Sequence, residues 1–104
     1  MSKVFLYAEY QLSVPFSELD WGPINVDMKK HPGLKSKTWL SGFNNNTLGG
    51  FYEFDSVENA HKYVESYLFP FSMESKGSLT IKLFDGDITK EAAIDMDSPF
   101  YTGA

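Results

Sequence analysis

The sequence contains no cysteine and no arginine, and each absence removes a class of function. Without cysteine, the 104-residue chain has no disulfide, no thiolate nucleophile and no cysteine-bound zinc, which fits a reducing compartment. All nine basic residues are lysines, so the planar guanidinium that reads guanine and clamps phosphate is missing. The formal net charge of −5 also repels a polyanion. We therefore expect no nucleic-acid partner.

Long apolar runs are missing as well. The apolar stretch at residues 4–8 is interrupted by Glu9, far short of the ~18 residues of a membrane span. We therefore expect a cytoplasmic chain with no membrane partner. Hydrophobic residues still make up 42% of the sequence, enough for a core in one compact domain. We assign residues 1–95 to that domain and residues 96–104 to a C-terminal aromatic tail.

The sequence also offers few metal ligands. His31 and His61 are the only histidines, and neither has a second ligand at the local spacing of a metal site. The acidic run at residues 85–87 lacks the twelve-residue frame of a calcium loop, so a solvated segment is the better interpretation. We therefore expect no metal, and structural or solvent-facing roles for both histidines.

Hydrophobic periodicity and turn residues predict the order strand, helix, strand, strand, helix, strand. A helix that begins at Pro23, as its first residue, follows a looser turn. The second helix begins after the N-cap Ser56 and ends at Pro70. The expected strands cover residues 4–12, 34–41, 48–55 and 78–85, and a further short helix covers residues 89–94.

With right-handed crossovers, this order predicts an α+β, ferredoxin-like βαββαβ fold. Its four-stranded antiparallel sheet carries two helices on one face. The other face stays open and is partly apolar, which favours a second copy as its cover, in a homodimer.

A double glycine lies inside the third strand, where glycine costs stability and needs a reason. If Ser41 faces Leu48 across the hairpin, Trp39 faces Gly50 and Lys37 faces Tyr52. Gly50 then gives the Trp39 ring room to lie across the sheet. Two interpretations remain open: simple packing relief, or a cavity beside the indole ring.

Two lysines and several aromatic residues fall on the predicted strands. A lysine on the covered face of the sheet needs a partner or a ligand anion, whereas on the open face it is solvated. The pattern predicts an α+β domain that binds a small apolar or aromatic ligand. The set consists of Tyr7, Trp39, Tyr52, Phe54 and Phe84, with Lys37 and Lys82.

Short motifs in a fixed order extend over most of the chain, from Pro15-Phe16 to Asp85. They are Pro32-Gly33-Leu34, Lys37-Thr38-Trp39, Gly49-Gly50-Phe51-Tyr52-Glu53-Phe54, Ala60 and Lys82-Leu83-Phe84-Asp85. In this order the chain resembles the YdhR-type monooxygenases of the dimeric α+β barrel superfamily. The resemblance implies a homodimer packed through the open sheet faces and a pocket between sheet and helices. It also implies an activity that uses no flavin, haem or metal.

For such an activity, the protein must hold a flat phenol, quinol or anthrone in a dry pocket and stabilise its anion while dioxygen reacts. In this chemistry Lys37 or Lys82 would stabilise the anion, and Tyr52 or Tyr7 would donate a hydrogen bond or move the proton. The candidate catalytic residues are therefore Lys37, Tyr52 and Lys82, and the candidate substrate-binding residues are Tyr7, Trp39, Gly50, Phe54 and Phe84. Two alternatives remain open: a non-catalytic binder of small apolar compounds, and an isomerase or lyase that acts on an enolisable substrate.

The tail carries Phe100 and Tyr101, and two large aromatic rings are costly to leave in water. We expect residues 96–102 to dock, either on their own subunit or across the dimer near the pocket mouth, where they would act partly as a lid. The alternative is a frayed end whose aromatic residues matter little.

Overall fold

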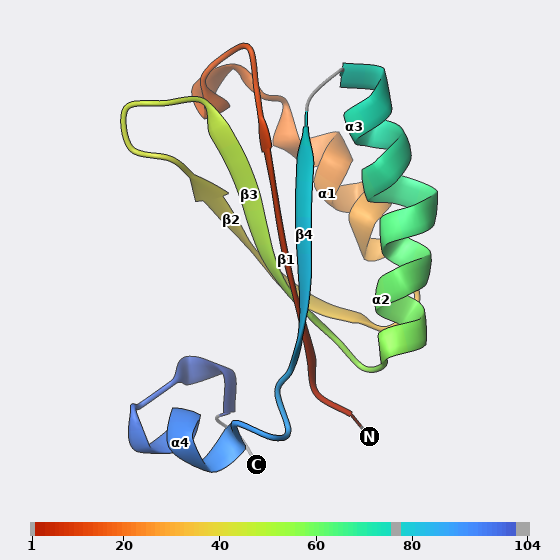
Figure 1. The fold of residues 1–104 in the computed structure, drawn as a ribbon. Coiled ribbons are helices and arrows are strands. Elements are labelled where there is room, and N and C mark those ends of the chain that lie inside the picture. The colour runs from red at the N-terminus through yellow and green to blue at the C-terminus, as the bar shows by residue number, and fades with distance from the viewer. Residues whose placement is uncertain (1, 76–77, 102–104) are drawn as a thin grey trace.

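A four-stranded antiparallel sheet, with helices packed on one of its faces, forms the framework of the computed structural model, which describes residues 2–75 and 78–101 (Figure 1). The strand order is β2-β3-β1-β4, so the predicted ferredoxin-like fold is confirmed. The strands are β1 (Val4–Gln11), β2 (Leu34–Ser41), β3 (Thr47–Phe54) and β4 (Leu79–Asp85). The helices are α1 (Trp21–Lys29), α2 (Val57–Tyr63), α3 (Phe69–Ser75) and α4 (Lys90–Asp95), with short turns η1 (Phe16–Glu18), η2 (Val64–Leu68) and η3 (Pro99–Tyr101).

The core lies between the sheet and the helices α1, α2 and α3. Alternation along β1 sends Val4, Leu6, Ala8 and Tyr10 to this covered face, where all four are buried. On the neighbouring strand β3, Tyr52 and Phe54 are buried in the same layer, and α2 adds Ala60 and Tyr63. The period-two pattern read from the sequence is therefore the pattern of burial in β1.

The hairpin register agrees with the prediction residue by residue. Ser41 pairs with Leu48, Trp39 with Gly50 and Lys37 with Tyr52. The even-numbered residues of β3 and the odd-numbered residues of the paired part of β2 share the covered face. Lys37, Trp39 and Tyr52 therefore point toward the helices.

The ends of two helices differ from the sequence prediction. α1 begins at Trp21, two residues before Pro23. Pro23 is tolerated in this first turn because the first N–H groups of a helix have no intrahelical partner, so the missing N–H of proline costs no hydrogen bond. The second helix begins at its predicted cap, where the Asn59 N–H donates to the Ser56 hydroxyl over 3.1 Å. Its predicted end at Pro70 is wrong.

The helical path continues past Pro70 because a π turn precedes it. The N–H of Phe69 donates to the carbonyl of Val64, five residues earlier. A π turn is wider than an α turn, so the proline ring avoids the carbonyl that it would meet in a regular helix. The chain therefore runs on as α3 and covers more of the sheet than the sequence predicted.

The tail docks on its own subunit. The ring of Phe100 lies 5.2 Å from that of Phe51 and 5.8 Å from that of Phe5, between centroids. The hydroxyl of Tyr101 donates to the carbonyl of Gly86 over 2.7 Å. Phe5 lies on the face of the sheet opposite α1, α2 and α3, and it is only 8% exposed because the tail covers it. Residue 102, the last of the expected docking segment, lies outside the described residues.

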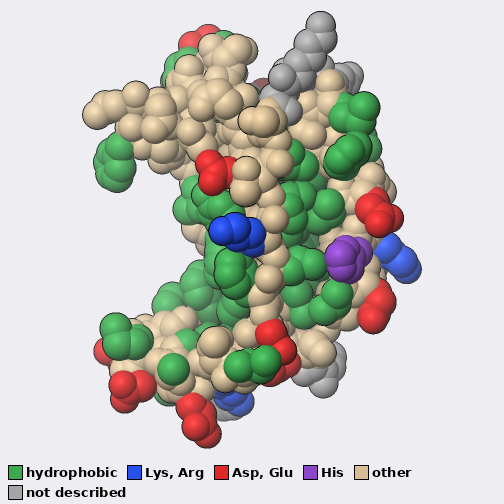
Figure 2. Space-filling view, viewed as in Figure 1, with side chains coloured by type: hydrophobic (Ala, Val, Ile, Leu, Met, Phe, Trp, Pro, Cys, Tyr) green, Lys and Arg blue, Asp and Glu red, His purple; other side chains and the backbone are tan. Residues whose placement is uncertain are grey.

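The remainder of this open face keeps exposed apolar side chains. Leu40 is 38% and Phe84 is 48% exposed. Figure 2 shows this flank hollowed between the hairpin loop above and α4 below, with apolar side chains in the hollow. None of the helices in the described residues is long and apolar enough to cross a membrane.

Candidate functional site

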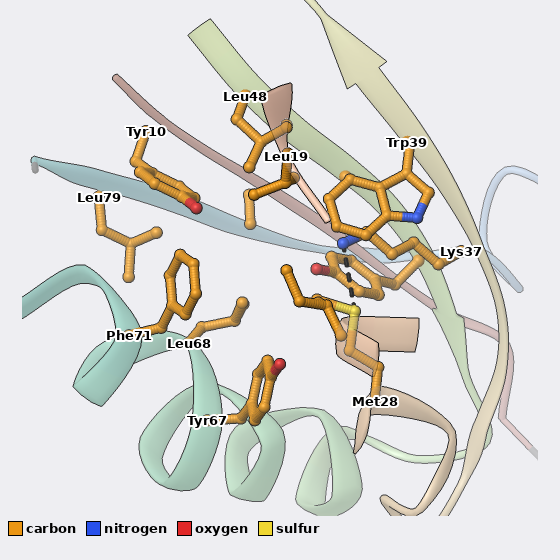
Figure 3. A pocket seen from close by; sticks show the side chains of 15 residues that line it. Tyr10, Leu19, Met28, Lys37, Trp39, Leu48, Tyr67, Leu68, Phe71 and Leu79 are labelled. Carbon is orange, nitrogen blue, oxygen red and sulfur yellow. Dashed lines mark hydrogen bonds between the residues drawn. The ribbon is translucent and has the colours of Figure 1, made fainter. Parts of the chain in front are cut away.

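An apolar cavity lies between the covered face of the sheet and the helices (Figure 3). Every strand contributes to its wall, and α1 and α3 close it from the other side. We call it the inner cavity. The residues that line it are Ala8, Tyr10, Leu19, Ile24, Met28, Lys37, Trp39, Leu48, Gly49, Gly50, Tyr52, Tyr67, Leu68, Phe71 and Leu79.

Lys37 is the one charged residue among the described residues that line the inner cavity. Its Nζ lies 3.2 Å from the centroid of the Trp39 ring, 4.9 Å from that of the Tyr52 ring and 3.3 Å from Sδ of Met28. Burial disfavours the ammonium form and lowers the pKa of Lys37 to about 7. Near neutral pH, this amine can therefore both accept and carry a proton.

Gly50 makes room for Lys37 rather than for Trp39. A Cβ at position 50 would lie 2.7 Å from Cε of Lys37 and 2.8 Å from Cε1 of Tyr52. Trp39 pairs with Gly50 and both line the cavity, but the atoms nearest to position 50 belong to Lys37 and Tyr52. The indole instead turns toward α1, where its Nε1 donates to Oδ1 of Asn25 over 2.9 Å. The missing side chain thus lets a lysine enter the cavity wall.

Four tyrosine hydroxyls lie in or beside the cavity: burial raises the pKa of Tyr67, and the other three belong to Tyr10, Tyr52 and Tyr63. Tyr63 donates to the hydroxyl of Tyr52 over 3.1 Å, and burial raises the pKa of both phenols. The hydroxyl of Tyr10 is buried without a hydrogen-bond partner in the described part of the chain, and Figure 3 shows it directed into the cavity. Burial also raises the pKa of Tyr10. All four phenols therefore stay protonated at neutral pH and can donate hydrogen bonds.

A second hollow adjoins the first at the β2 edge of the sheet. This outer cleft has a free volume of about 210 Å³, whereas the inner cavity has only about 20 Å³, room for about one water molecule. Met28, Lys37 and Trp39 line both. These three side chains therefore form the partition between the two spaces.

The structure separates the residues that the sequence grouped as a site. Lys37, Trp39, Gly50 and Tyr52 lie together in the cavity wall. Phe54 shares their face of the sheet but is fully buried in the core and does not line the cavity.

Three further members of that group lie on the open face. Tyr7 pairs with Lys82 across β1 and β4, and Phe84 follows two residues later on the same face. The hydroxyl of Tyr7 donates to Glu9. Because the sheet stands between these residues and the cavity, they cannot contact a ligand there within one subunit. The tail also lies on the open face, so it is no lid over the cavity of its own subunit.

Several residues that complete the cavity were not among the predicted site residues. Phe71 was missed because the second helix was expected to end at Pro70. Tyr67 and Met28 were missed because their roles depend on how η2 and α1 pack over the sheet. Tyr10 carried a usable signal, since it falls on the same strand face as Leu6 and Ala8. In the described ranges, no three histidine, aspartate or glutamate side chains gather as a metal site would require.

Comparison with known proteins gives a family and a fold. The family model described as "Putative mono-oxygenase ydhR" matches residues 11–94. No curated protein matches the sequence. Three similar solved structures, all under 25% identical, support the fold alone.

The first is SnoaB from Streptomyces nogalater, described as a cofactor-independent oxygenase, with 12% identity and a TM-score of 0.61 over 81% of this chain and 92% of that one. The second is the NE2512 protein of unknown function from Nitrosomonas europaea, with 14% identity and a TM-score of 0.63 over 82% and 89%. The third is a dimeric ferredoxin-like protein from an uncultured marine organism, with 14% identity and a TM-score of 0.56 over 82% and 95%.

Proposed function

Because the chain belongs to the YdhR mono-oxygenase family, we propose that it is a cofactor-independent monooxygenase that acts on a small, flat phenol, quinol or anthrone in the inner cavity. The observation that carries this proposal is Lys37: an amine with a pKa of about 7, in a wall of aromatic and aliphatic side chains. SnoaB, which shares the fold, is described as a cofactor-independent oxygenase.

Lys37 supplies the acid–base chemistry of this proposal. Its neutral amine accepts a proton from the substrate, and the resulting ammonium stabilises the delocalised oxyanion. The anion transfers an electron to dioxygen, and recombination forms a C–O bond to the ring carbon. The resulting peroxide anion takes the proton back from the Lys37 ammonium and becomes a hydroperoxide. For an anthrone, loss of water from this hydroperoxide gives the quinone, so one oxygen atom enters the product and the other leaves as water. Dioxygen is the only oxidant that this balance needs.

The neighbouring side chains orient the substrate. Trp39 offers a flat wall, and the Tyr52 hydroxyl, which accepts from Tyr63, keeps its own proton for an oxygen of the ligand. Tyr10 offers a second donor from β1. Such an arrangement suits a planar ligand with oxygen atoms at two positions.

A ring system needs more room than the inner cavity has, because ligand pockets measure roughly 300–1,000 Å³. Lys37 and Met28, two of the three partition side chains, are unbranched and flexible. Their movement would join the inner cavity to the outer cleft. We therefore expect substrate to bind in a joined space, with Trp39 held in place by Asn25.

Oxygen uptake tests the proposal. Purified protein with anthrone, without added flavin or metal and with a chelator present, should consume oxygen and form anthraquinone. Lys37→Met should lower kcat at least about 100-fold, the usual contribution of a general base, whereas Lys62→Met on the exposed face of α2 should not change it. Equal rates for the wild type and the Lys37 variant would contradict the proposal.

The same measurements separate the rival functions. Binding of anthrone and related quinols without oxygen uptake or product would identify a non-catalytic binder. Turnover of an enolisable ketone at the same rate under argon as in air would identify an isomerase or lyase. Each rival uses the same cavity, so the oxygen dependence decides among the three.

We further propose that the open sheet face packs against a second copy of the chain. Leu40 and Phe84 expose apolar surface there, and one protein with this fold is described as dimeric. Sedimentation at micromolar concentration should give a dimer, and Phe84→Glu should shift it toward monomer. A monomeric wild type would contradict this arrangement.

A further inference from the structure

The hydroxyl of Tyr10 faces the inner cavity without a partner. Tyr10 is only 8% exposed, and its hydroxyl is shut off from solvent with no hydrogen-bond partner among the described residues. Other tyrosines of the chain differ: Tyr52 and Tyr63 bond to each other, and the half-buried Tyr101 donates to Gly86. A buried hydroxyl without a partner lowers the stability of a protein, so its presence in the cavity needs a reason.

The packing around Tyr10 keeps its ring from turning away from the cavity. The residue belongs to β1, a central strand of the sheet, and pairs with Leu48 on one side and Leu79 on the other. The ring of Phe71 meets its ring edge-on, with centroids 5.4 Å apart. Burial raises the pKa of Tyr10, so the phenol keeps its proton. The cavity therefore has a hydrogen-bond donor held at a fixed point.

Tyr10 and Lys37 lie at opposite ends of the cavity (Figure 3). Tyr10 is level with Leu48 on β3, whereas Lys37 is level with Tyr52, four residues farther along the same strand. At about 3.3 Å per strand residue, these backbone positions are about 13 Å apart along the sheet. Lys37 also borders the outer cleft, and Tyr10 does not. A ligand that enters from the cleft thus meets Lys37 first and Tyr10 last.

The two polar groups offer different chemistry to a ligand. The Lys37 amine takes a proton from an acidic hydroxyl and then faces the resulting anion, as proposed above. The Tyr10 phenol keeps its proton and donates a hydrogen bond to a neutral oxygen. Most of the remaining lining is aliphatic or aromatic. The arrangement fits a flat ring system with an ionisable oxygen at one end and a neutral oxygen at the other.

We propose that Tyr10 determines specificity, because its hydroxyl donates to a neutral oxygen at the end of the substrate remote from the ionised one. This inference rests on the proposed function for the position of the ionised oxygen beside Lys37. It narrows the substrate class to flat phenols, quinols or anthrones that carry oxygen at both ends. A compound without the second oxygen leaves the Tyr10 hydroxyl buried and unpaired, and the site discriminates against it for that reason.

Two naphthols of the same shape test the inference without any oxidation. 2,6-Dihydroxynaphthalene has a hydroxyl where 6-methyl-2-naphthol has a methyl group, so the two differ only at the end that should meet Tyr10. Calorimetric titration of the wild type under argon should give the lower Kd for the diol. In Tyr10→Phe, the Kd of the methyl compound divided by that of the diol should fall at least about 10-fold, and the methyl compound should bind at least as tightly as the diol.

Tyr101→Phe is the matched control, since it removes a tyrosine hydroxyl on the other side of the sheet. It should keep the wild-type preference for the diol. Thermal unfolding separates specificity from structure: the Tm of Tyr10→Phe should equal or exceed that of the wild type, because the hydroxyl that it removes has no partner in the described part of the chain.

Five outcomes would each overturn the inference. They are equal binding of both naphthols to the wild type, an unchanged ratio of Kd values in Tyr10→Phe, an equal loss of preference in Tyr101→Phe, no binding of either naphthol, and a Tm of Tyr10→Phe lowered as far as that of Tyr52→Phe. The last would show that the Tyr10 hydroxyl has a structural role.

The two proposals fail in different ways. A preference for the diol that depends on Tyr10, without oxygen uptake with any phenol or anthrone, keeps the selection by Tyr10 and removes the oxygenase. Oxygen uptake with anthrone that depends on Lys37, combined with equal binding of the two naphthols, keeps the oxygenase and removes the selection by Tyr10.

Discussion

The ammonium nitrogen of Lys37 lies 3.2 Å from the centroid of the Trp39 ring, on the covered side of the sheet. The face of an indole ring attracts a cation, which partly offsets the loss of water around the charge. The described residues that line the inner cavity include no carboxylate that could complete this compensation. The Lys37 amine beside Trp39 is therefore easily deprotonated. Its lowered pKa affects both the stability of the protein and the chemistry of the cavity.

The first prediction concerns the pH dependence of stability. Burial lowers the pKa of Lys37 from its ordinary value to about 7 in the folded protein. Between pH 7 and the ordinary value, the unfolded chain holds a proton that the folded chain has lost, so this residue makes stability rise with pH across that window. Compared with Lys37→Met, the wild type should gain at most about 1.4 kcal/mol of unfolding free energy per pH unit there. Below pH 7 the difference should be constant.

Urea unfolding of both proteins between pH 6 and 10 measures this difference. Other titrating groups are common to the two proteins and cancel in the subtraction. Lys62→Met, which removes an exposed lysine, should show no such slope. A flat difference between the wild type and Lys37→Met across the window would contradict the lowered pKa.

The second prediction concerns the buried hydroxyl pair of Tyr52 and Tyr63, whose oxygens lie 3.1 Å apart. Removal of one hydroxyl leaves its partner buried without that hydrogen bond, so Tyr52→Phe and Tyr63→Phe should each cost about 1–3 kcal/mol. Removal of both leaves nothing unsatisfied, so the double variant should lose less than the sum. Equilibrium unfolding of the four proteins gives the coupling free energy, and strict additivity would rule out the interaction.

The third prediction concerns Gly50. A methyl group there would meet Cε of Lys37 and Cε1 of Tyr52 at less than 3 Å, and the tyrosine ring has little freedom to move. Gly50→Ala should therefore destabilise the protein by about 1–3 kcal/mol and displace Lys37 from the ring of Trp39. The midpoint of urea unfolding measures the loss of stability. An increase in Trp39 fluorescence measures the displacement, because an amine next to an indole ring quenches its fluorescence.

Gly22 provides the matched control. Apart from its chain neighbours and the helix backbone, an added Cβ would have no neighbour closer than 4.0 Å. Gly22 is the second residue of α1 and precedes Pro23, so the preference of a helix for alanine over glycine, roughly 0.5–1 kcal/mol, is opposed by contact with the proline ring. Gly22→Ala should thus change the stability little. Destabilisation of similar size by both substitutions would show that the crowding around Gly50 is not the cause.

The sequence predicted the sheet well because strand faces and hairpin register follow local rules. Alternation along β1 placed Leu6 and Ala8 in the core, and the loop before β3 set Trp39 opposite Gly50. It predicted the helices less well. The π turn that carries the chain past Pro70 depends on the packing of α3 over the sheet, which no local pattern encodes.

The part of the candidate site that lies on the β2–β3 hairpin was predicted correctly, because it follows from the hairpin register. Lys37 and Tyr52 are register partners, so the hairpin that the sequence predicted also brings them together. Tyr7 and Lys82 entered the predicted site as an aromatic residue and a lysine on predicted strands, although alternation places them on the other face from Leu6. The depth of the cavity comes from Met28 and Phe71, whose contribution depends on how two helices cross the sheet.

The last prediction concerns the tail, whose rings cover one end of the open sheet face. Phe100 packs against Phe5 and Phe51, and Tyr101 adds a hydrogen bond to Gly86 and lies 4.8 Å from the Lys3 ammonium. A chain that ends at Ser98 loses all of these contacts. Because both rings are half-buried, it should be less stable by about 1–2 kcal/mol, below the range for full burial of two aromatic side chains.

A chain that ends at Tyr101 is the control, since it keeps every contact of Phe100 and Tyr101 given above. Thermal unfolding should place its Tm near that of the full chain and above that of the chain ending at Ser98. The tail also lies beside the surface that we propose as the dimer interface, so the shorter chain should expose Phe5 and Phe51 and change the dimer dissociation constant. The anthrone affinities of the two truncated chains should be equal, because the sheet separates the tail from the inner cavity. A loss of ligand affinity without a loss of stability would contradict this placement and would return the tail to the role of a lid, formed across the dimer.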